Sequence, residues 1–284
     1  MRKLGGPNAQ QVEYWNTQGP RWVEVGPRID AQLEPLGLAT IERAAVRAGE
    51  RVLDVGCGCG QATLQLAERV GATGSVLGSD ISEPMLARAR ERAGEAGLEN
   101  VEFRQGDAQT EPFPESHFDL IFSRYGVMFF ADSEAAFANL RAALRPGGRL
   151  VFVCWQELGK NPWLEQPLGA VLAHVAPPEP APAGAPGPFA FADADRVRGV
   201  LENAGFGQIA FESLEQPILV GGGGAVDETV SFVLEFGPAS RLLEGVGSDV
   251  RERVRESITR VLEAHANVDG VRLGSASWIV TARR

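Results

Sequence analysis

The first half of the chain alternates between short apolar runs and longer stretches with helical spacing of apolar positions. The apolar runs are rich in Val, Leu, Ile and Phe and are bounded by Gly, Asp or Asn. This alternation is typical of βαβ units, which wind a parallel sheet with helices on both faces. It predicts an α/β, Rossmann-like doubly wound fold, with strands at 51–55, 75–79, 101–105, 118–123 and 150–155 and helices at 61–70, 83–96 and 131–144.

The flanking regions are less regular. Before the first strand, helices are expected at 8–33 and 38–48. After residue 155 the pattern predicts a short helix and then a loop rich in Pro, Ala and Gly. A last strand is expected to pair antiparallel at a sheet edge. The elements expected beyond residue 155 are helices at 161–175, 193–203, 226–236 and 247–266, the loop at 176–188, and strands at 208–214 and 271–282.

Charge and composition narrow the classes of function. The 284 residues carry a formal net charge of −10 and show no basic stripe, which argues against a nucleic-acid partner. No apolar run reaches the ~20 residues that a membrane-spanning helix needs. The amino-terminal sequence has two basic residues but no apolar stretch behind them, so no secretory signal is expected. Three cysteines form no disulfide framework, which favours a cytoplasmic location.

The first predicted strand runs into a glycine-rich loop, VLDVGCGCG, at 52–60. Glycines at 56, 58 and 60 let a ligand approach the backbone closely. A dinucleotide fingerprint requires glycine where Gln61 stands, and the Lys and Ser/Thr of a phosphate-binding P-loop are absent. Asp54 would be unfavourable beside a pyrophosphate but suits a ligand with an ammonium group. The loop therefore favours a nucleoside that carries an amino acid.

The ends of the following strands add matching chemistry. Asp80 can accept hydrogen bonds from both ribose hydroxyls, and Asp107 followed by Ala108 can meet an adenine edge. The fourth strand is expected to carry Asp119 and Ser123 toward the same carboxyl edge. Ligands of open α/β sheets bind at that edge, so these residues together predict one nucleoside site.

The order and spacing of five motifs resemble those of the class I S-adenosylmethionine-dependent methyltransferases. The motifs are VLDVGCGCG, the acid of GSD, GDA, FDLIF and LRPGG. The resemblance covers residues 45–155 and is strongest to the ubiquinone/menaquinone-type C-methyltransferases, whose amino-terminal region is not matched by residues 1–30. It implies S-adenosylmethionine as cofactor and a seven-stranded sheet with a reversed last strand. The implied roles are Gly56 and Gly58 under the methionine moiety, Asp80 on the ribose, Ile81 on an adenine face, and Asp107 with Ala108 at the adenine edge.

We expect the chain to divide into three parts. Residues 1–35 are expected to form a helical cover, and residues 36–155 the S-adenosylmethionine-binding core. Residues 156–284 are expected to complete the sheet and to carry helical lid insertions at 156–190 and 225–266. We expect a small-molecule methyl acceptor, no nucleic-acid or membrane partner and no metal, and the sequence leaves the oligomeric state open.

Several of these residues have a purely structural alternative. Asp80 could cap the next helix, and Asp107 could form an Asx turn. Cys57 and Cys59 invite a metal or arsenic-thiolate interpretation, but no third ligand lies near in sequence, so both are expected to be small residues of a tight loop. His117 and His265 are expected to lie on the surface without a chemical role.

The acceptor side is less defined. Arg124, Tyr125 and His174 are candidates to contact the acceptor, although Arg124 could instead pair with a carboxylate. Tyr14, Trp15 and Trp22 could cover the sulfonium through cation–π attraction or simply pack the amino-terminal arm. No general base can be named. Methyl transfer to a macromolecule and a non-catalytic S-adenosylmethionine-binding module remain alternative functions.

Overall fold

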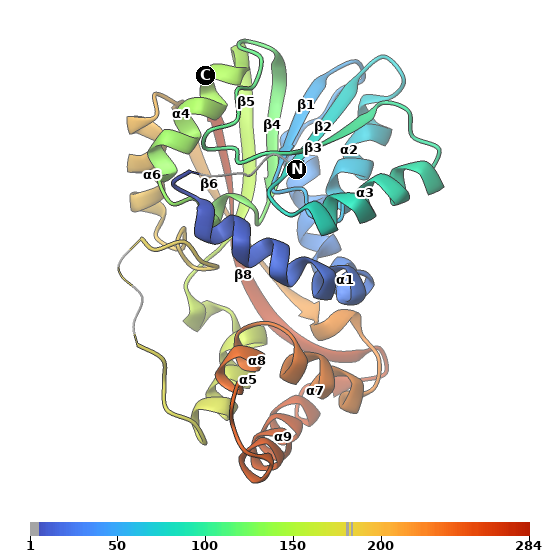
Figure 1. Cartoon of the computed structure of the whole chain (residues 1–284), viewed down its shortest axis with the longest axis vertical. Helices are drawn as coiled ribbons and strands as arrows, with labels where there is room; N and C mark the ends of the chain where they lie inside the picture. The colour runs from blue at the N-terminus through green and yellow to red at the C-terminus, as the bar shows by residue number, and fades with distance from the viewer. Residues whose placement is uncertain (1–5, 180–181, 183) are drawn as a thin grey trace.

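The computed structural model describes residues 6–179, 182 and 184–284. Residues 1–5 of the predicted cover and 180, 181 and 183 of the predicted 156–190 insertion lie outside the described residues. Within the described chain, seven strands form one twisted sheet in the order β3-β2-β1-β4-β5-β8-β6 (Figure 1). Their bounds are β1 Arg51–Val55, β2 Ser75–Asp80, β3 Val101–Gln105, β4 Phe118–Arg124, β5 Leu144–Trp155, β6 Gly207–Leu219 and β8 Gly270–Arg283.

The pairing confirms the predicted fold class. Strands β1 to β5 pair parallel with one another, and β8 runs antiparallel to both β5 and β6. A two-residue strand, β7 (Ala266–Asn267), pairs only with the start of β8. The reversed strand is therefore β8, the last in sequence, as the resemblance implies.

The expectation that this last strand lies at the sheet edge is wrong. Strand β8 is inserted between β5 and β6, and β6 forms the edge. The burial of the two strands gives the reason, because β8 is largely buried, whereas most residues of β6 are exposed or half-buried. An apolar run such as that of 276–282 is stabilised more by an interior position than by an edge.

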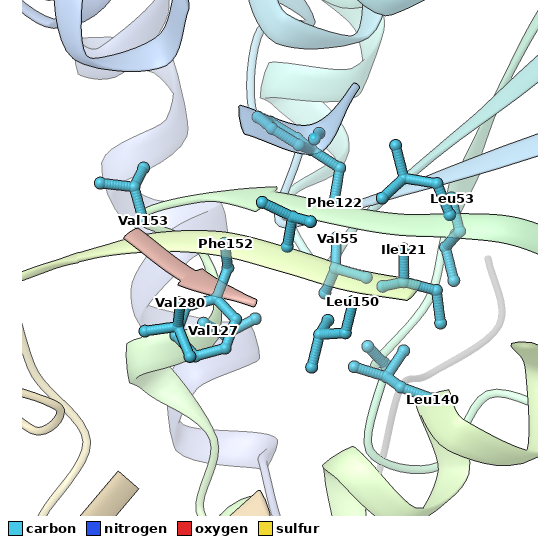
Figure 2. Close-up of a cluster of buried hydrophobic side chains, with 14 of the residues drawn as sticks. Leu53, Val55, Ile121, Phe122, Val127, Leu140, Leu150, Phe152, Val153 and Val280 are labelled. Carbon is cyan, nitrogen blue, oxygen red and sulfur yellow. The ribbon is translucent and has the colours of Figure 1, made fainter. Parts of the chain in front are cut away.

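Helices cover both faces of the sheet. Helix α2 follows β1 and α3 follows β2, and both contact α1, while α4 and α6 pack together near β5 and β6 (Figure 1). Figure 2 shows Leu150 and Phe152 of β5 and Val280 of β8 on the same side of the sheet as Leu140 of α4, whereas Phe122 of β4 points to the opposite side. The helices are α2 Gln61–Val70, α3 Glu83–Glu95, α4 Ser133–Ala143 and α6 Ala194–Asn203.

The amino-terminal region is one continuous helix, α1 (Ala9–Ala44), rather than the two helices expected at 8–33 and 38–48. The boundary proposed between residues 35 and 36 falls inside it. Prolines normally break helix interiors, yet Pro20, Pro27 and Pro35 all lie within α1 on its exposed side. There water can hydrate the carbonyl groups that lack an N–H partner, which allows the helix to continue.

A second layer of helices lies beyond the carboxyl end of the sheet. Figure 1 shows α5, α7, α8 and α9 gathered around the long extensions of β6 and β8, with α1 between them and the core. They share an apolar cluster of their own, which includes Val171, Val230 and Ile258. No helix of the described chain has the length and apolar character to cross a membrane. The bounds are α5 Pro162–Leu172, α7 Val226–Glu235, α8 Pro238–Leu242 and α9 Ser248–Glu263.

Candidate functional site

A cavity of about 400 Å³ lies where the carboxyl ends of the parallel strands meet α1 and the second layer of helices. Glycine-rich turns and acids from β1, β2 and β3 form its floor, and aromatic side chains from α1 and α7 form much of its cover. All the predicted cofactor residues except Ser123 line it, namely Asp54, Gly56, Gly58, Asp80, Ile81, Asp107 and Ala108.

Asp54 is a buried acid of which only one carboxylate oxygen forms a hydrogen bond with a described residue. Its Oδ2 accepts a hydrogen bond from Thr63 Oγ1 at 2.6 Å, whereas Oδ1 is buried and has no partner among the described residues. Burial raises the pKa of this carboxyl to about 6, although the Thr63 hydroxyl opposes the shift. An unpartnered carboxylate oxygen in a cavity is costly unless a ligand donates to it.

Asp80 holds the glycine loop in place. Its Oδ2 accepts the N–H of Gly58 at 2.8 Å and its Oδ1 accepts the N–H of Ser82 at 2.8 Å. Burial raises the pKa of Asp80, and these backbone N–H groups counteract that rise. Asp80 thus caps the turn before α3, and each oxygen keeps a further lone pair for a ligand in the cavity.

The end of β3 is tied to the start of α1. Asp107 Oδ1 accepts hydrogen bonds from Asn8 Nδ2 at 3.1 Å and from the N–H of Gln109 at 3.0 Å, and Asn8 Oδ1 accepts the N–H of Ala131. The bond to Gln109 is the Asx-type turn weighed above, and it leaves Oδ2 of Asp107 available. Asn8 is a site-building residue that the sequence did not reveal.

Two side chains of β4 lie elsewhere than expected. Ser123 is fully buried and its hydroxyl donates to the carbonyl of Val55 at 2.7 Å, so it supports the loop and does not face the cavity. Asp119 lies at the opposite end of the strand, where it accepts the N–H of Arg51 and pairs with Arg145. With about 3.3 Å of rise per residue, the four residue steps from Asp119 to Ser123 place them about 13 Å apart. The expectation that Asp119 reaches the carboxyl edge is wrong.

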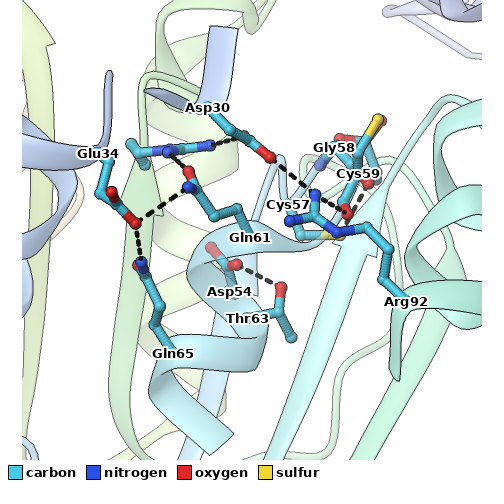
Figure 3. Close-up of polar contacts among 12 residues, drawn as sticks. Asp30, Glu34, Asp54, Cys57, Gly58, Cys59, Gln61, Thr63, Gln65 and Arg92 are labelled. Atoms are coloured by element: carbon cyan, nitrogen blue, oxygen red, sulfur yellow. Dashed lines mark hydrogen bonds and ion pairs between the residues drawn. The ribbon is translucent and has the colours of Figure 1, made fainter. Parts of the chain in front are cut away.

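Arg124 belongs to an ion-pair network that fastens α1 over the glycine loop. Figure 3 labels Asp30, Arg92 and Gln61 of this network. Asp30 of α1 pairs with Arg92 of α3 at 2.8 Å and with Arg124 at 3.2 Å, and Arg124 also donates to the side chain of Gln61. Each of the three charged side chains is less than a quarter exposed. Arg124 still lines the cavity, but its charge is engaged by the carboxylate of Asp30.

Sequence patterns gave little indication of Asp30 or Asn16. Asn16 bridges α1 to the start of α3, because its amide donates to the carbonyl of Ile81 and accepts the N–H of Glu83. Polar residues at helical spacing usually lie on a solvated face. A weak signal was available in Gly19, where a Cβ would lie 2.7 Å from Ser82 Oγ, because glycine within a helix often marks a close approach.

Replacing Asp30 by Asn should destabilise the fold by about 2 kcal/mol, since it leaves two partly buried guanidinium groups without their shared carboxylate. Glu34, one turn later on α1, offers a matched control, because it is exposed and contacts Gln61 and Gln65 only at 3.4 and 3.3 Å. Glu34→Gln should change stability by less than about 0.5 kcal/mol. Urea unfolding of both variants measures the difference, and equal losses would contradict the assigned role of Asp30.

The other two acceptor-side candidates differ in position. Tyr125 lines the cavity and stacks on Trp155 with ring centroids 4.2 Å apart, but its hydroxyl bonds Ser277 Oγ at 2.8 Å. Burial raises the pKa of Tyr125, so its hydroxyl stays protonated. His174 is not among the cavity-lining residues, and its ring bonds Ser257 on α9. We therefore drop His174 from the acceptor side.

The cysteines of the loop have the properties of inert thiols. Burial raises the pKa of Cys57 and raises that of Cys59 to about 11, so neither presents a thiolate near neutral pH. Among the described residues, no group of His, Cys, Asp and Glu is arranged to hold a metal ion.

Comparison with known proteins shows the family to which the chain belongs. A family model described as a methyltransferase domain matches residues 52–148. A ubiquinone/menaquinone biosynthesis C-methyltransferase of Teredinibacter turnerae is 33% identical over 185 residues, which cover 62% of this chain and 74% of the relative. The chain belongs to the class I S-adenosylmethionine-dependent methyltransferases. S-adenosylmethionine is the cofactor of this family.

Other members of the class match shorter stretches. Aklanonic acid methyltransferase of Streptomyces sp. (strain C5) is 41% identical over 118 residues, 42% of this chain and 54% of that protein. This methyltransferase chain spans about half the length of the first curated relatives it matches. The structure of Haemonchus contortus phosphoethanolamine N-methyltransferase 2 in complex with S-adenosyl-L-methionine aligns with a TM-score of 0.55 at 19% identity, covering 88% of this chain and 52% of the other, which shows a shared fold.

Proposed function

We propose that this protein transfers a methyl group from S-adenosylmethionine to a small-molecule acceptor. One observation carries the proposal, namely that a single cavity joins the acids at the strand ends to an aromatic wall from the helical cover. The part of the cavity beside the acids suits a nucleoside that carries an amino acid, and the part beside the aromatic wall suits an apolar or aromatic acceptor.

Residues of the cavity floor fit the cofactor's polar groups. The unpartnered Asp54 Oδ1 would accept from the ammonium group, and the remaining lone pairs of Asp80 would accept from the ribose hydroxyls. Gly58 has a φ of +54°, and a Cβ there would meet only Met85 Sδ at 3.9 Å, so its backbone leaves room for the methionine moiety.

Residues at the ends of β2 and β3 would hold the adenine. Ile81 lines the cavity and would cover one face of the ring. Asp107 Oδ2 would accept from the adenine amino group, while the backbone of Ala108 would meet the neighbouring ring nitrogen. Ser123 would act indirectly in this proposal, because its hydroxyl fixes the carbonyl of Val55 at the start of the glycine loop.

When bound, S-adenosylmethionine supplies the methyl group in an already activated sulfonium. The protein then has to position the acceptor and exclude water, and positioning alone can supply effective molarities of about 10⁵–10⁸ M. Helix α1 serves both needs by closing the cavity with Trp15 and Trp22, whose rings contact each other and Phe129 and Phe236 in edge-to-face pairs. Such rings attract cations as well as planar apolar acceptors.

The net charge of the chain and the helices that cover the cavity favour a small acceptor rather than a macromolecule. The net charge of −10 disfavours nucleic acid, and the helices above the cavity limit access for a folded polypeptide. The three cysteines are free, which supports a cytoplasmic, reducing setting for this activity.

The proposed ammonium contact predicts a pH dependence. Because the pKa of Asp54 is raised to about 6, its carboxyl is increasingly protonated below that pH and loses the negative charge that attracts an ammonium group. S-adenosylmethionine should bind about tenfold more weakly at pH 5 than at pH 7. Asp54→Asn should bind weakly at both values and lose most of this dependence, although the raised pKa of Asp80 leaves a residual slope. Calorimetric titration across this range checks it, and an unchanged pH profile in Asp54→Asn would rule out the contact.

The proposed activity is tested with S-adenosylmethionine that carries an isotopically labelled methyl group and a panel of aromatic phenols, carboxylic acids, amines and quinones. Release of S-adenosylhomocysteine together with a product heavier by one labelled methyl group is the expected result. Tight cofactor binding without transfer to any compound of a broad panel would favour a non-catalytic binding module. Transfer to tRNA or protein instead would support a macromolecular acceptor.

A further inference from the structure

The acceptor half of the cavity has a polar corner in an otherwise apolar wall. Tyr14, Gln18 and Arg21 of α1 follow one another at spacings of four and three residues, so they share one face of the helix, and all three line the cavity. Arg241 of α8 lines it from the opposite side, and its guanidinium carbon lies 5.9 Å from the centre of the Tyr14 ring.

Hydrogen bonding divides these four residues into two groups. Arg21 is already committed, because it pairs with both Glu24 and Glu235 at 2.5 Å. The side chains of Tyr14, Gln18 and Arg241, in contrast, form no hydrogen bond or ion pair with another described residue. A phenol hydroxyl, a carboxamide and a guanidinium can each donate, so the corner holds a set of unused donors.

The ion pairs at the corner do not include Arg241. Arg21 and Glu235 line this part of the cavity, and Arg21 pairs with both Glu235 and Glu24, so its charge is taken up by these two carboxylates. Arg241 forms no ion pair with a described residue, so its guanidinium is the one left to meet a ligand. It is exposed as well as cavity-lining, which places it where the cavity opens to solvent and where an acceptor would enter.

We propose that Tyr14, Gln18 and Arg241 form a subsite that binds an anionic oxygen of the acceptor, which makes the acceptor an aromatic compound with a carboxylate or an acidic enol. This inference rests on the proposed function and names its substrate class. Aromatic rings of Trp15, Trp22 and Phe236 beside the corner contact the planar part, while the donors fix its orientation. Guanidinium groups suit such oxygens because they donate two parallel hydrogen bonds.

A subsite of this kind also explains why only a few polar side chains lie in the acceptor half of the cavity. A few well-placed polar groups in an apolar pocket determine which ligand is oriented correctly, and they disfavour an isostere that leaves them unpaired. A neutral acceptor of the same shape would offer the guanidinium of Arg241 no negative charge to pair with. Discrimination between charged and neutral acceptors is therefore the property to measure.

The experiment uses the full chain saturated with S-adenosylhomocysteine and four probes. Naphthalene-2-carboxylate is compared with its neutral isostere naphthalene-2-carboxamide, and 2-hydroxy-1,4-naphthoquinone, an enolate near neutral pH, with 1,4-naphthoquinone. At least one anion should bind about tenfold more tightly than its neutral partner. The pair that shows the preference distinguishes a carboxylate from an enolate.

Variants assign the preference to the corner. Arg241→Gln should reduce the preference to near one, and Tyr14→Phe should weaken binding of the anion by a few fold, with the affinity for S-adenosylhomocysteine unchanged in both. Arg253→Gln, on the exposed face of α9 outside the cavity, removes the same charge and should retain the preference.

Each outcome is decisive. Equal affinity for charged and neutral probes in the wild-type protein would overturn the subsite without any variant having to fold. A preference that survives Arg241→Gln would overturn it as well. If S-adenosylhomocysteine itself fails to bind, the proposed function fails first, so the two failures are distinguishable.

Discussion

Asp80→Ala is expected to weaken S-adenosylmethionine binding by about 100-fold or more. Two hydrogen bonds from ribose hydroxyls to a charged acceptor would be lost, each worth about 1.5–3 kcal/mol. The same substitution frees the N–H groups of Gly58 and Ser82, so the glycine loop loses the acceptor that fixes its geometry. Calorimetric titration of the folded variant measures the loss.

Asp119 provides a matched control for this prediction. It is also a buried acid of the sheet, and it also accepts a backbone N–H, from Arg51, while pairing with Arg145. It lies outside the cavity, at the opposite end of β4. Asp119→Ala should lower stability but leave cofactor affinity within about twofold in the protein that remains folded. If Asp80→Ala binds as tightly as Asp119→Ala, the ribose role assigned to Asp80 is wrong.

Gly126→Ala should lower the free energy of unfolding by about 3 kcal/mol and abolish cofactor binding. A Cβ at Gly126 would lie 2.6 Å from the carbonyl oxygen of Val55 and 2.8 Å from the Cα of Gly56. Both are backbone atoms, so they cannot rotate away as a flexible side chain would. The glycine loop would have to move, and with it the cavity floor around Asp54.

Gly94→Ala is the corresponding control, because Gly94 lies within α3 and a Cβ there meets no atom within 4 Å. That variant should be slightly more stable, by less than about 1 kcal/mol, because alanine replaces glycine in the last turn of a helix. Thermal unfolding and cofactor titration of the two variants show whether the loss in Gly126→Ala comes from close packing at Gly126 or from a general intolerance of replacing glycine. Similar behaviour of both would contradict the close approach of β4 to the loop.

The core of the fold was predictable because the apolar pattern and the glycine motif that indicate its elements each lie within a short stretch of sequence. Strand β1 and helix α2 have the bounds expected from the apolar pattern, and Gly56 and Gly58 lie in the turn between them with positive φ. In a parallel sheet, residues at the carboxyl ends of successive strands meet at one edge. Asp54, Asp80 and Asp107 could therefore be placed together before any contact was known.

Features that depend on long-range packing were not predictable. The continuity of α1 depends on which side of the helix its prolines face, and the interior place of β8 depends on a partner strand, β6, more than fifty residues away. Asp119 was misplaced because a strand's direction and length decide which of its residues reach the edge. The pairing of Asp30 with Arg92 and Arg124 joins residues that are far apart in sequence.

The central claim is that the cavity binds S-adenosylmethionine through both its nucleoside and its amino-acid part. Calorimetric titration of the wild-type protein at pH 7 with S-adenosylmethionine, and separately with 5′-methylthioadenosine, tests it most directly. The account predicts saturable binding of one S-adenosylmethionine per chain, with 5′-methylthioadenosine weaker by about tenfold or more because it offers no ammonium group to Asp54. Absence of saturable S-adenosylmethionine binding, or equal affinity for the two ligands, would contradict the account.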